Sequence, residues 1–162
     1  MLGIDRGMRM FGLFGKIKAL EQIAANIATM INISFWSLRK DNDGDPVEMS
    51  NDRFVLGYIY GVTGGGIHTA GLSKPKDKGS VLVAVYDSLF PGRGREIALK
   101  CNEWSNNKDE VFLRAIKIAV EESAIVYKAM VSGDENAVEE SIGALKTFDE
   151  YLRANYLQDN DI

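Results

Sequence analysis

The chain has 162 residues, 46% hydrophobic and 26% charged, with a formal net charge of -4. These values are typical of a single globular domain. Nucleic acid is excluded as the main partner because phosphate binding draws on clustered Lys and Arg, and the cations here are scattered. The one cysteine, Cys101, excludes an intrachain disulfide and suits a reducing compartment. No apolar run approaches the ~20 residues that span a bilayer, and the N-terminus lacks a signal-peptide pattern, so we expect a soluble cytoplasmic protein with no integral membrane segment.

The N-terminus is expected to form an arm, residues 1–15, either flexible or packed on the domain. The segment from Met10, MFGLFGKIK, looks like a natural start, so whether residues 1–9 belong to the native protein stays open. A membrane-touching arm is an alternative, carried by apolar residues beside two cations (Phe11, Leu13, Phe14 with Lys16 and Lys18). We favour packing of these aromatic residues onto the domain.

Residues 16–157 are predicted to form a single helical domain, followed by a C-terminal tail, residues 158–162. The first helix spans about residues 16–33, where apolar residues recur at steps of three and four (Ile17, Leu20, Ala24, Ile27 and Ile31).

The segment FVLGYIYGVTGGGIHTAG, residues 54–71, holds six of the sixteen glycines. A phosphate-binding loop is disfavoured, because neither a Walker sequence nor GxGxxG is present and no helix-length segment follows. We predict instead a helix that begins with Asp45 as N-cap and Pro46 at the first helical position.

Four small residues, Gly57, Gly61, Gly65 and Thr69, fall four apart along one ridge of that helix. A ridge with almost no side-chain height allows another helix to approach closely. The occupant is either another helix of this chain, which we favour, or the same face of a second copy. Because each interior glycine costs ~1 kcal/mol against alanine, the helix is expected to end or kink near residues 64–66.

Residues 81–90 fit both a strand and a helix. Valines alternate as in a strand (Val81, Val83 and Val85), while other spacings stack along a helix (Val81, Val85 and Leu89). A lone strand would leave its backbone groups unpaired, which favours a helix. The preceding SKPKDKGS, with Lys74, Lys76 and Lys78, is predicted to be a solvated connector.

Residues 108–157 are predicted to form an antiparallel helical hairpin. The segment Asn107 to Glu110 starts the first arm, Gly133 ends it and Asp134 caps the second. The first arm carries a broad apolar face (Phe112, Ile116, Val120, Tyr127 and Met130), and the second repeats apolar residues at helical spacing (Val138, Ile142, Leu145, Phe148 and Leu152).

Other chemistry-bearing residues give weak signals. The carboxylates of DNDGDPVE do not match a calcium loop and are interpreted as helix capping (Asp41, Asp43, Asp45 and Glu48). Cys101 is expected to be a small core residue. The adjacent Glu pairs, 121–122 and 139–140, are expected on solvated helix faces. With one histidine, His-based metal sites and di-iron motifs are not expected, and no cofactor is predicted.

The prediction is therefore an all-α single-domain bundle of about five or six helices with no catalytic or metal-binding residues assigned. The expected function is self-association or protein–protein interaction, through a homodimer or a protein partner. The alternative is a small-molecule-binding or enzymatic domain with a pocket near the glycine ridge (Tyr58, Tyr60, His68 and Trp104).

Overall fold

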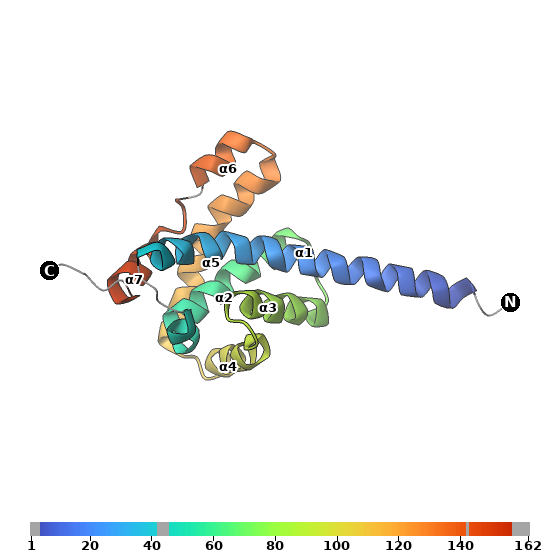
Figure 1. Ribbon diagram of the computed structural model, residues 1–162, viewed down its shortest axis with the longest axis horizontal. Helices are drawn as coiled ribbons and strands as arrows, with labels where there is room; N and C mark the ends of the chain where they lie inside the picture. Colours follow the sequence, from blue (N-terminus) through green and yellow to red (C-terminus); the bar gives the residue numbers. More distant parts are fainter. Residues whose placement is uncertain (1–3, 42–45, 142, 157–162) are drawn as a thin grey trace.

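A computed structural model describes residues 4–41, 46–141 and 143–156, with side chains for 15–36, 48–137, 140–141 and 143–156. The described residues form seven α-helices and one 3-10 helix and contain no β-strand (Figure 1). The elements are α1 (Ile4–Asp41), η1 (Pro46–Asn51), α2 (Arg53–Thr69), α3 (Pro75–Leu89), α4 (Gly94–Asn106), α5 (Glu110–Ser132), α6 (Glu135–Ser141) and α7 (Lys146–Tyr156). The predicted all-α single domain is confirmed.

Helix α2 lies at the centre of the molecule, and its most extensive contact is with α5. It is apolar on several sides, and a row of its side chains is completely buried (Val55, Leu56, Tyr58, Ile59 and Val62). Helix α1 packs mainly along α3, and α3 packs in turn on α4. At the end of the core, the Phe148 ring of α7 stacks on Tyr58 at 4.4 Å and meets Phe35 of α1 edge-on at 5.7 Å.

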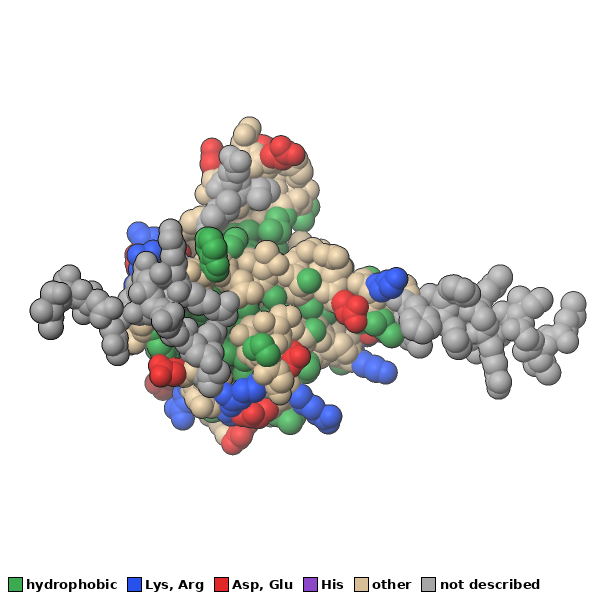
Figure 2. All heavy atoms as spheres, viewed as in Figure 1, with side chains coloured by type: hydrophobic (Ala, Val, Ile, Leu, Met, Phe, Trp, Pro, Cys, Tyr) green, Lys and Arg blue, Asp and Glu red, His purple; other side chains and the backbone are tan. Residues whose placement is uncertain are grey.

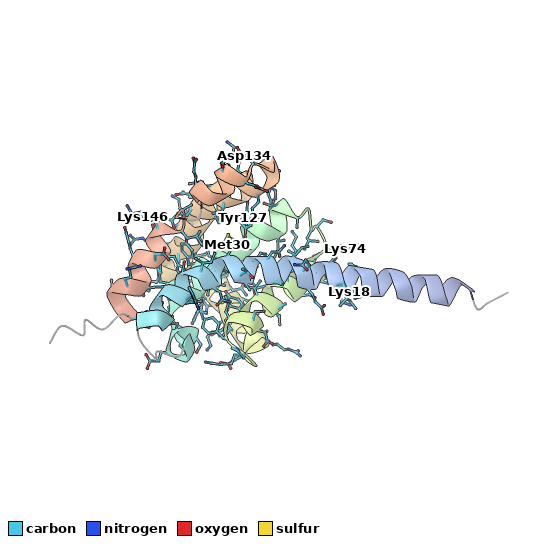
Figure 3. The ribbon with its side chains drawn as sticks, turned by 45° about the horizontal axis from the view of Figure 1, so that its top comes forward. Lys18, Met30, Lys74, Tyr127, Asp134 and Lys146 are labelled. Atoms are coloured by element: carbon cyan, nitrogen blue, oxygen red, sulfur yellow. The ribbon has the colours of Figure 1, made fainter. Side chains whose placement is uncertain are left out.

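Helix α1 is longer than predicted. Its 38 residues continue through the predicted helix at 16–33 and back through most of the predicted arm, so the backbone of residues 4–15 is helical. From Lys18 towards the N-terminus, the ribbon of α1 extends with no other helix beside it (Figures 1 and 3). An ion pair of 2.8 Å between Lys16 and Asp77 ties α1 to α3 near this point. The expected packing of Phe11, Leu13 and Phe14 concerns side chains outside the described set.

The start of α2 lies later than predicted. Pro46 opens the 3-10 helix η1, and α2 begins at Arg53 with Asp52 as its N-cap. The Asp52 carboxylate accepts hydrogen bonds from the backbone N–H groups of Phe54, at 2.8 Å, and Val55, at 3.0 Å. Asp52 therefore does what was predicted for Asp45, which lies outside the described residues together with the C-terminal tail 158–162.

The predicted end of this helix near residues 64–66 is wrong. Helix α2 runs unbroken from Arg53 to Thr69, and the chain turns only at Gly71, whose φ is 69°. Burial on either side of the glycines offsets their low helix propensity (Val62, Thr63, Gly66 and Ile67 are buried), since most helical stability in proteins comes from tertiary packing.

Residues 81–90 belong largely to helix α3, which ends at Leu89. The helical spacing identified from the sequence is the buried one, because Val81, Val85 and Leu89 are all at most 1% exposed. Pro75 stands at the start of α3, where its missing N–H and fixed φ are tolerated. Part of the predicted Lys connector is therefore the first turn of a helix.

The C-terminal region agrees with the prediction at its turn and departs from it in the second arm. Gly133 ends α5 in the left-handed conformation, with φ of 69°, and the Asp134 carboxylate accepts the backbone N–H of Asn136 at 3.0 Å. The second arm consists of two helices, α6 and α7. Helix α7 turns away so that Phe148 and Leu152 reach the core, which one straight helix along α5 would not allow.

The start of α5 also shifts. Its N-cap is Asp109, whose carboxylate accepts the backbone N–H of Phe112 at 3.0 Å, so the cap lies two residues after Asn107. The buried face of α5 is narrower than predicted, because Val120 and Met130 are exposed while Phe112 and Tyr127 are buried.

Candidate functional site

The glycines of α2 fall into two groups according to what lies above them. Gly57 and Gly61 lie against the backbone of α5: a Cβ at Gly57 would stand 2.6 Å from the Phe112 carbonyl oxygen, and one at Gly61 would stand 2.6 Å from that of Ile116. Gly65 lies against the Tyr127 ring, while Thr69 is exposed and its hydroxyl donates to the Gly65 carbonyl at 2.9 Å. Along the glycine ridge, the neighbour is thus a helix of the same chain.

Polar side chains form hydrogen bonds across this contact between α2 and α5. The Tyr127 hydroxyl donates to the Val62 carbonyl at 2.7 Å, and the Tyr58 hydroxyl donates to Glu122 at 2.5 Å. Glu122 also accepts the backbone N–H of Thr147 at 3.1 Å, which joins the start of α7 to α5. Burial, reinforced by the Glu122 carboxylate, raises the pKa of Tyr58 far above its usual range. These groups satisfy one another, and we assign them a structural role.

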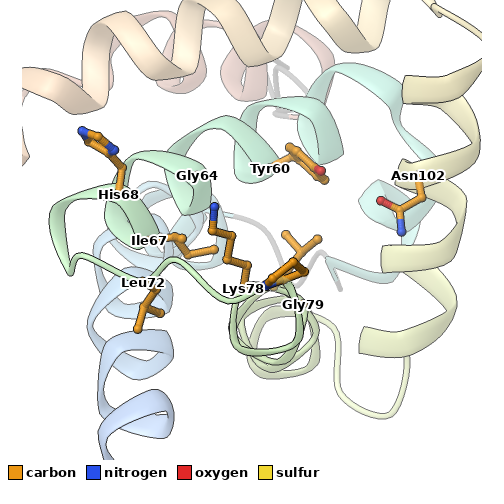
Figure 4. A pocket seen from close by; sticks show the side chains of 10 residues that line it. Tyr60, Gly64, Ile67, His68, Leu72, Lys78, Gly79 and Asn102 are labelled. Carbon is orange, nitrogen blue, oxygen red and sulfur yellow. The ribbon is translucent and has the colours of Figure 1, made fainter.

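A cleft of about 470 Å³ lies between α2, α3 and α4, on a different side of α2 from the contact with α5 (Figure 4). Its apolar lining comes from α2, the α2–α3 loop and α3 (Ile67, Leu72, Pro75 and Leu82). Four polar side chains complete it (Tyr60, His68, Lys78 and Asn102). A concave, mainly apolar space with a few polar groups is the usual form of a small-molecule site.

Two helical glycines, Gly64 and Gly79, form part of the cleft lining. A Cβ added at either position would meet no atom within 4 Å, so no close approach requires glycine there. A glycine inside a helix costs ~1 kcal/mol relative to alanine. At Gly57 and Gly61 helix packing explains that cost, whereas Gly64 and Gly79 are solvent-exposed and no neighbouring atom limits the size of their side chains.

The described residues that line the cleft include one cation, Lys78, and no carboxylate, while Tyr60, His68 and Asn102 can both donate and accept hydrogen bonds. The Lys78 side chain is solvent-exposed and, like those of Lys74 and Lys76, makes no ion pair or hydrogen bond with a described residue. In Figure 4 the Lys78 side chain extends from α3 towards α2 near Gly64. The His68 imidazole points away from Ile67 and Lys78, so it stands at the rim of the cleft.

A second depression, about 610 Å³, continues from the cleft between α3 and α4. The two spaces share Gly79, Leu82 and Asn102. The second space adds two cations, Lys76 and Arg95, together with Asp87, which accepts the backbone N–H of Gly94 at 3.1 Å. Cations therefore outnumber carboxylates along the joined surface.

Of the four side chains predicted to share a pocket, Tyr60 and His68 line the cleft and Tyr58 and Trp104 do not. Tyr58 and Tyr60 are two residues apart on α2, which turns them to nearly opposite sides of the helix. Trp104 packs on Phe112 at 5.7 Å. Lys78, Asn102 and the lining glycines were not predicted, because no local pattern links residues from three helices.

Cys101 is completely buried on α4, as expected of a core residue. Its sulfur lies 3.2 Å from the Tyr86 hydroxyl, which donates to the Leu56 carbonyl of α2 at 2.8 Å. Burial raises the pKa of the Cys101 thiol to about 11, so it is protonated at neutral pH. A buried thiol of this kind does not serve as a nucleophile.

The predicted capping carboxylates lie mostly outside the described side chains (Asp41, Asp43 and Asp45). Among the side chains that are described, no group of three or more His, Cys, Asp or Glu could hold a metal ion. Glu121 is exposed, whereas Glu122 is partly buried in the contact with Tyr58, so the expectation of a fully solvated pair is wrong for Glu122. The side chain of Glu139 is outside the described set.

No family model matches the chain, and no curated protein or solved structure matches it significantly. Within the described ranges, no helix has the length and apolar character needed to cross a membrane.

Proposed function

We propose that the protein binds a small molecule in the cleft between α2, α3 and α4. The observation that carries this function is the lining of the cleft, where an apolar wall (Ile67, Leu72 and Leu82) lies beside a few polar side chains (Tyr60, Lys78 and Asn102). The cleft volume of about 470 Å³ lies within the ~300–1,000 Å³ of small-molecule sites. The function assigned is binding, with no catalytic step.

The test is a fluorescence titration with N-phenyl-1-naphthylamine, an uncharged apolar probe, on wild type and Gly79→Leu. A Cβ at this position meets no atom within 4 Å, and the leucine side chain occupies part of the cleft, so the probe should bind wild type and bind the variant at least about tenfold more weakly. Gly15→Leu is the matched control, because Gly15 is also helical and open but lies on α1 away from the cleft. Probe binding that is absent from wild type, or equal in wild type and Gly79→Leu, would refute the proposal.

Protein association is the second candidate, and a separate observation favours it. Ten large hydrophobic residues of the described part are exposed, and six of them lie on α5 (Val111, Leu113, Val120, Ile125, Met130 and Val131). Val120 and Val131 also border a shallow groove of about 340 Å³ against the end of α2. Hydrophobic side chains reach the surface between α6 and α1 in Figure 2 as well. Leu113, Val120 and Val131 fall on one side of α5 by helical spacing, and clustered exposed apolar groups often mark interaction surfaces.

Self-association through α5 is tested by size-exclusion chromatography with light scattering. Since α5 of the same chain covers Gly57 and Gly61, we propose the outer surface of α5, rather than the glycine ridge, as the contact. A wild-type dimer that becomes monomeric in Val120→Lys/Val131→Lys, but not in the α1 control Ile33→Lys, would support this candidate. A wild-type monomer at every accessible concentration would exclude self-association.

A further inference from the structure

We propose that the ligand of the cleft is an anionic amphiphile, a carboxylate with an apolar tail, whose head group binds to the Lys78 ammonium. This inference rests on the proposed binding function and adds the chemical class of the ligand. It follows from how charge and apolar surface are distributed within the cleft.

The first step concerns the head group. Lys78 contributes a cation that no described carboxylate neutralises, and none of the described lining residues is acidic. In Figure 4, Tyr60 and Asn102 lie on one side of the Lys78 ammonium, with the Tyr60 hydroxyl directed towards Asn102, so the ammonium alone is assigned to the head group. Charge-assisted hydrogen bonds from an ammonium to a carboxylate are stronger than neutral ones, and no described lining residue carries a negative charge to pair with a cationic head.

The second step concerns the tail. Ile67 and Leu72 lie on the other side of the Lys78 ammonium in Figure 4, and Pro75 and Leu82 extend the apolar wall. Gly64 and Gly79 remove side-chain bulk from α2 and α3 where these helices face the cleft. An aliphatic chain gains by leaving water for such a surface, at ~25 cal/mol per Å² of apolar area buried.

The third step concerns selectivity against other charges. The protein is acidic overall, with a net charge of -4, yet the depression that continues from the cleft adds Lys76 and Arg95. A local excess of cations on an acidic protein draws anions to this surface and disfavours cationic ligands. Among the described residues of this depression Asp87 is the one carboxylate, so the two cations still exceed the negative charge.

The experiment measures displacement of N-phenyl-1-naphthylamine by decanoate, decanol and decylamine, which share a tail and differ in the head group. Wild type should release the probe at about tenfold lower decanoate than decanol, as expected for one charge-assisted hydrogen bond, and decylamine should be weakest. Lys78→Met keeps the apolar stem and removes the charge. It should lower the affinity for decanoate about tenfold and leave decanol unchanged.

Lys74→Met is the control, because Lys74 stands four residues earlier and does not line the cleft. Equal competition by decanoate and decanol in wild type, or an equal effect of Lys74→Met and Lys78→Met, would overturn the ligand class while probe binding still upheld the cleft. Failure of the probe to bind wild type would instead refute the proposed function. Folding of each variant is checked by its thermal transition before titration.

Discussion

Two groups of glycines in helices make opposite contributions to this molecule. Gly57 and Gly61 allow α5 to approach α2 until backbone atoms touch, so their missing side chains are replaced by another helix. Gly64 and Gly79 face open space across one cleft, and nothing replaces their side chains. Glycine has the same helix propensity in both groups. Packing against α5 therefore explains Gly57 and Gly61 and does not explain Gly64 and Gly79.

The largest expected effect concerns the glycines that pack against α5. Gly61→Leu should lower the free energy of unfolding by about 3 kcal/mol or more, because its Cβ would stand 2.6 Å from the Ile116 carbonyl and 2.7 Å from the Ala119 Cβ. Backbone cannot move aside as a side chain can. Gly64→Leu is the control on the same helix, and its stability should lie within about 1 kcal/mol of wild type or above it. Urea unfolding compares them, and equal stabilities would contradict the α2–α5 contact.

A second effect tests the burial of Cys101. Its thiol on α4 contacts the Tyr86 hydroxyl of α3, which donates a hydrogen bond to α2. Burial raises the pKa of the thiol from 9.0 to about 11, with the Tyr86 hydroxyl and Lys100 acting in the opposite direction. Below pH 9 the thiol is protonated in both states, so its stabilising contribution is complete. Between pH 9 and 11 the unfolded thiol ionises while the folded one does not, so the free energy of unfolding falls with rising pH. The total loss is about 2–3 kcal/mol.

Cys101→Ala removes this titration, so the difference between variant and wild type isolates the thiol from other groups. Stability is measured by urea unfolding from pH 8 to pH 11. The curves of the two proteins should converge as the pH rises, because only wild type loses the thiol contribution. Parallel curves over this range would mean that water reaches Cys101 and that the thiol is not buried as the structure shows.

A third effect is intermediate in size, because Gly66 is crowded by side-chain ends rather than by backbone. A Cβ there would stand 2.6 Å from the Ile27 Cδ1, which can shift, and 2.7 Å from the Tyr127 hydroxyl, which can move only by straining its hydrogen bond to the Val62 carbonyl. Gly66→Ala should therefore cost about 1 kcal/mol, the balance of overpacking and better helix propensity. In a Tyr127→Phe background the cost should shrink, because the hydroxyl is gone. Strict additivity in this double-mutant cycle would show that Tyr127 does not limit the space.

Much of the fold could be predicted from local sequence. Helical spacing identified the buried row of α3, and the turn chemistry of Gly133 and Asp134 marked the end of α5. The unbroken α2 could not be predicted in this way. Propensity acts on neighbouring residues, whereas the contact that offsets the cost of Gly61 comes from Ile116 and Ala119, more than fifty positions later.

The cleft could be predicted only in part. Tyr60 and His68 were identified because they lie close together in the glycine-rich segment. Lys78 is solvent-exposed, as the polar neighbours predict, but it lies in α3 rather than in a connector, and Asn102 has no local signal. Both become lining residues only when α3 and α4 pack beside α2, which is a tertiary event.

The smallest expected effect is a gain in stability, and it concerns Gly64 and Gly79. Gly64→Ala and Gly79→Ala should each raise the free energy of unfolding by up to about 1 kcal/mol, because alanine favours the helix and meets no atom within 4 Å. Urea unfolding measures both variants and their combination, and a loss of stability at either site would reveal a contact that the structure does not contain. The same variants narrow the cleft by one methyl group each, so the double variant should bind N-phenyl-1-naphthylamine more weakly than wild type. Higher stability with weaker binding is the trade-off expected where a residue is kept for function rather than for folding.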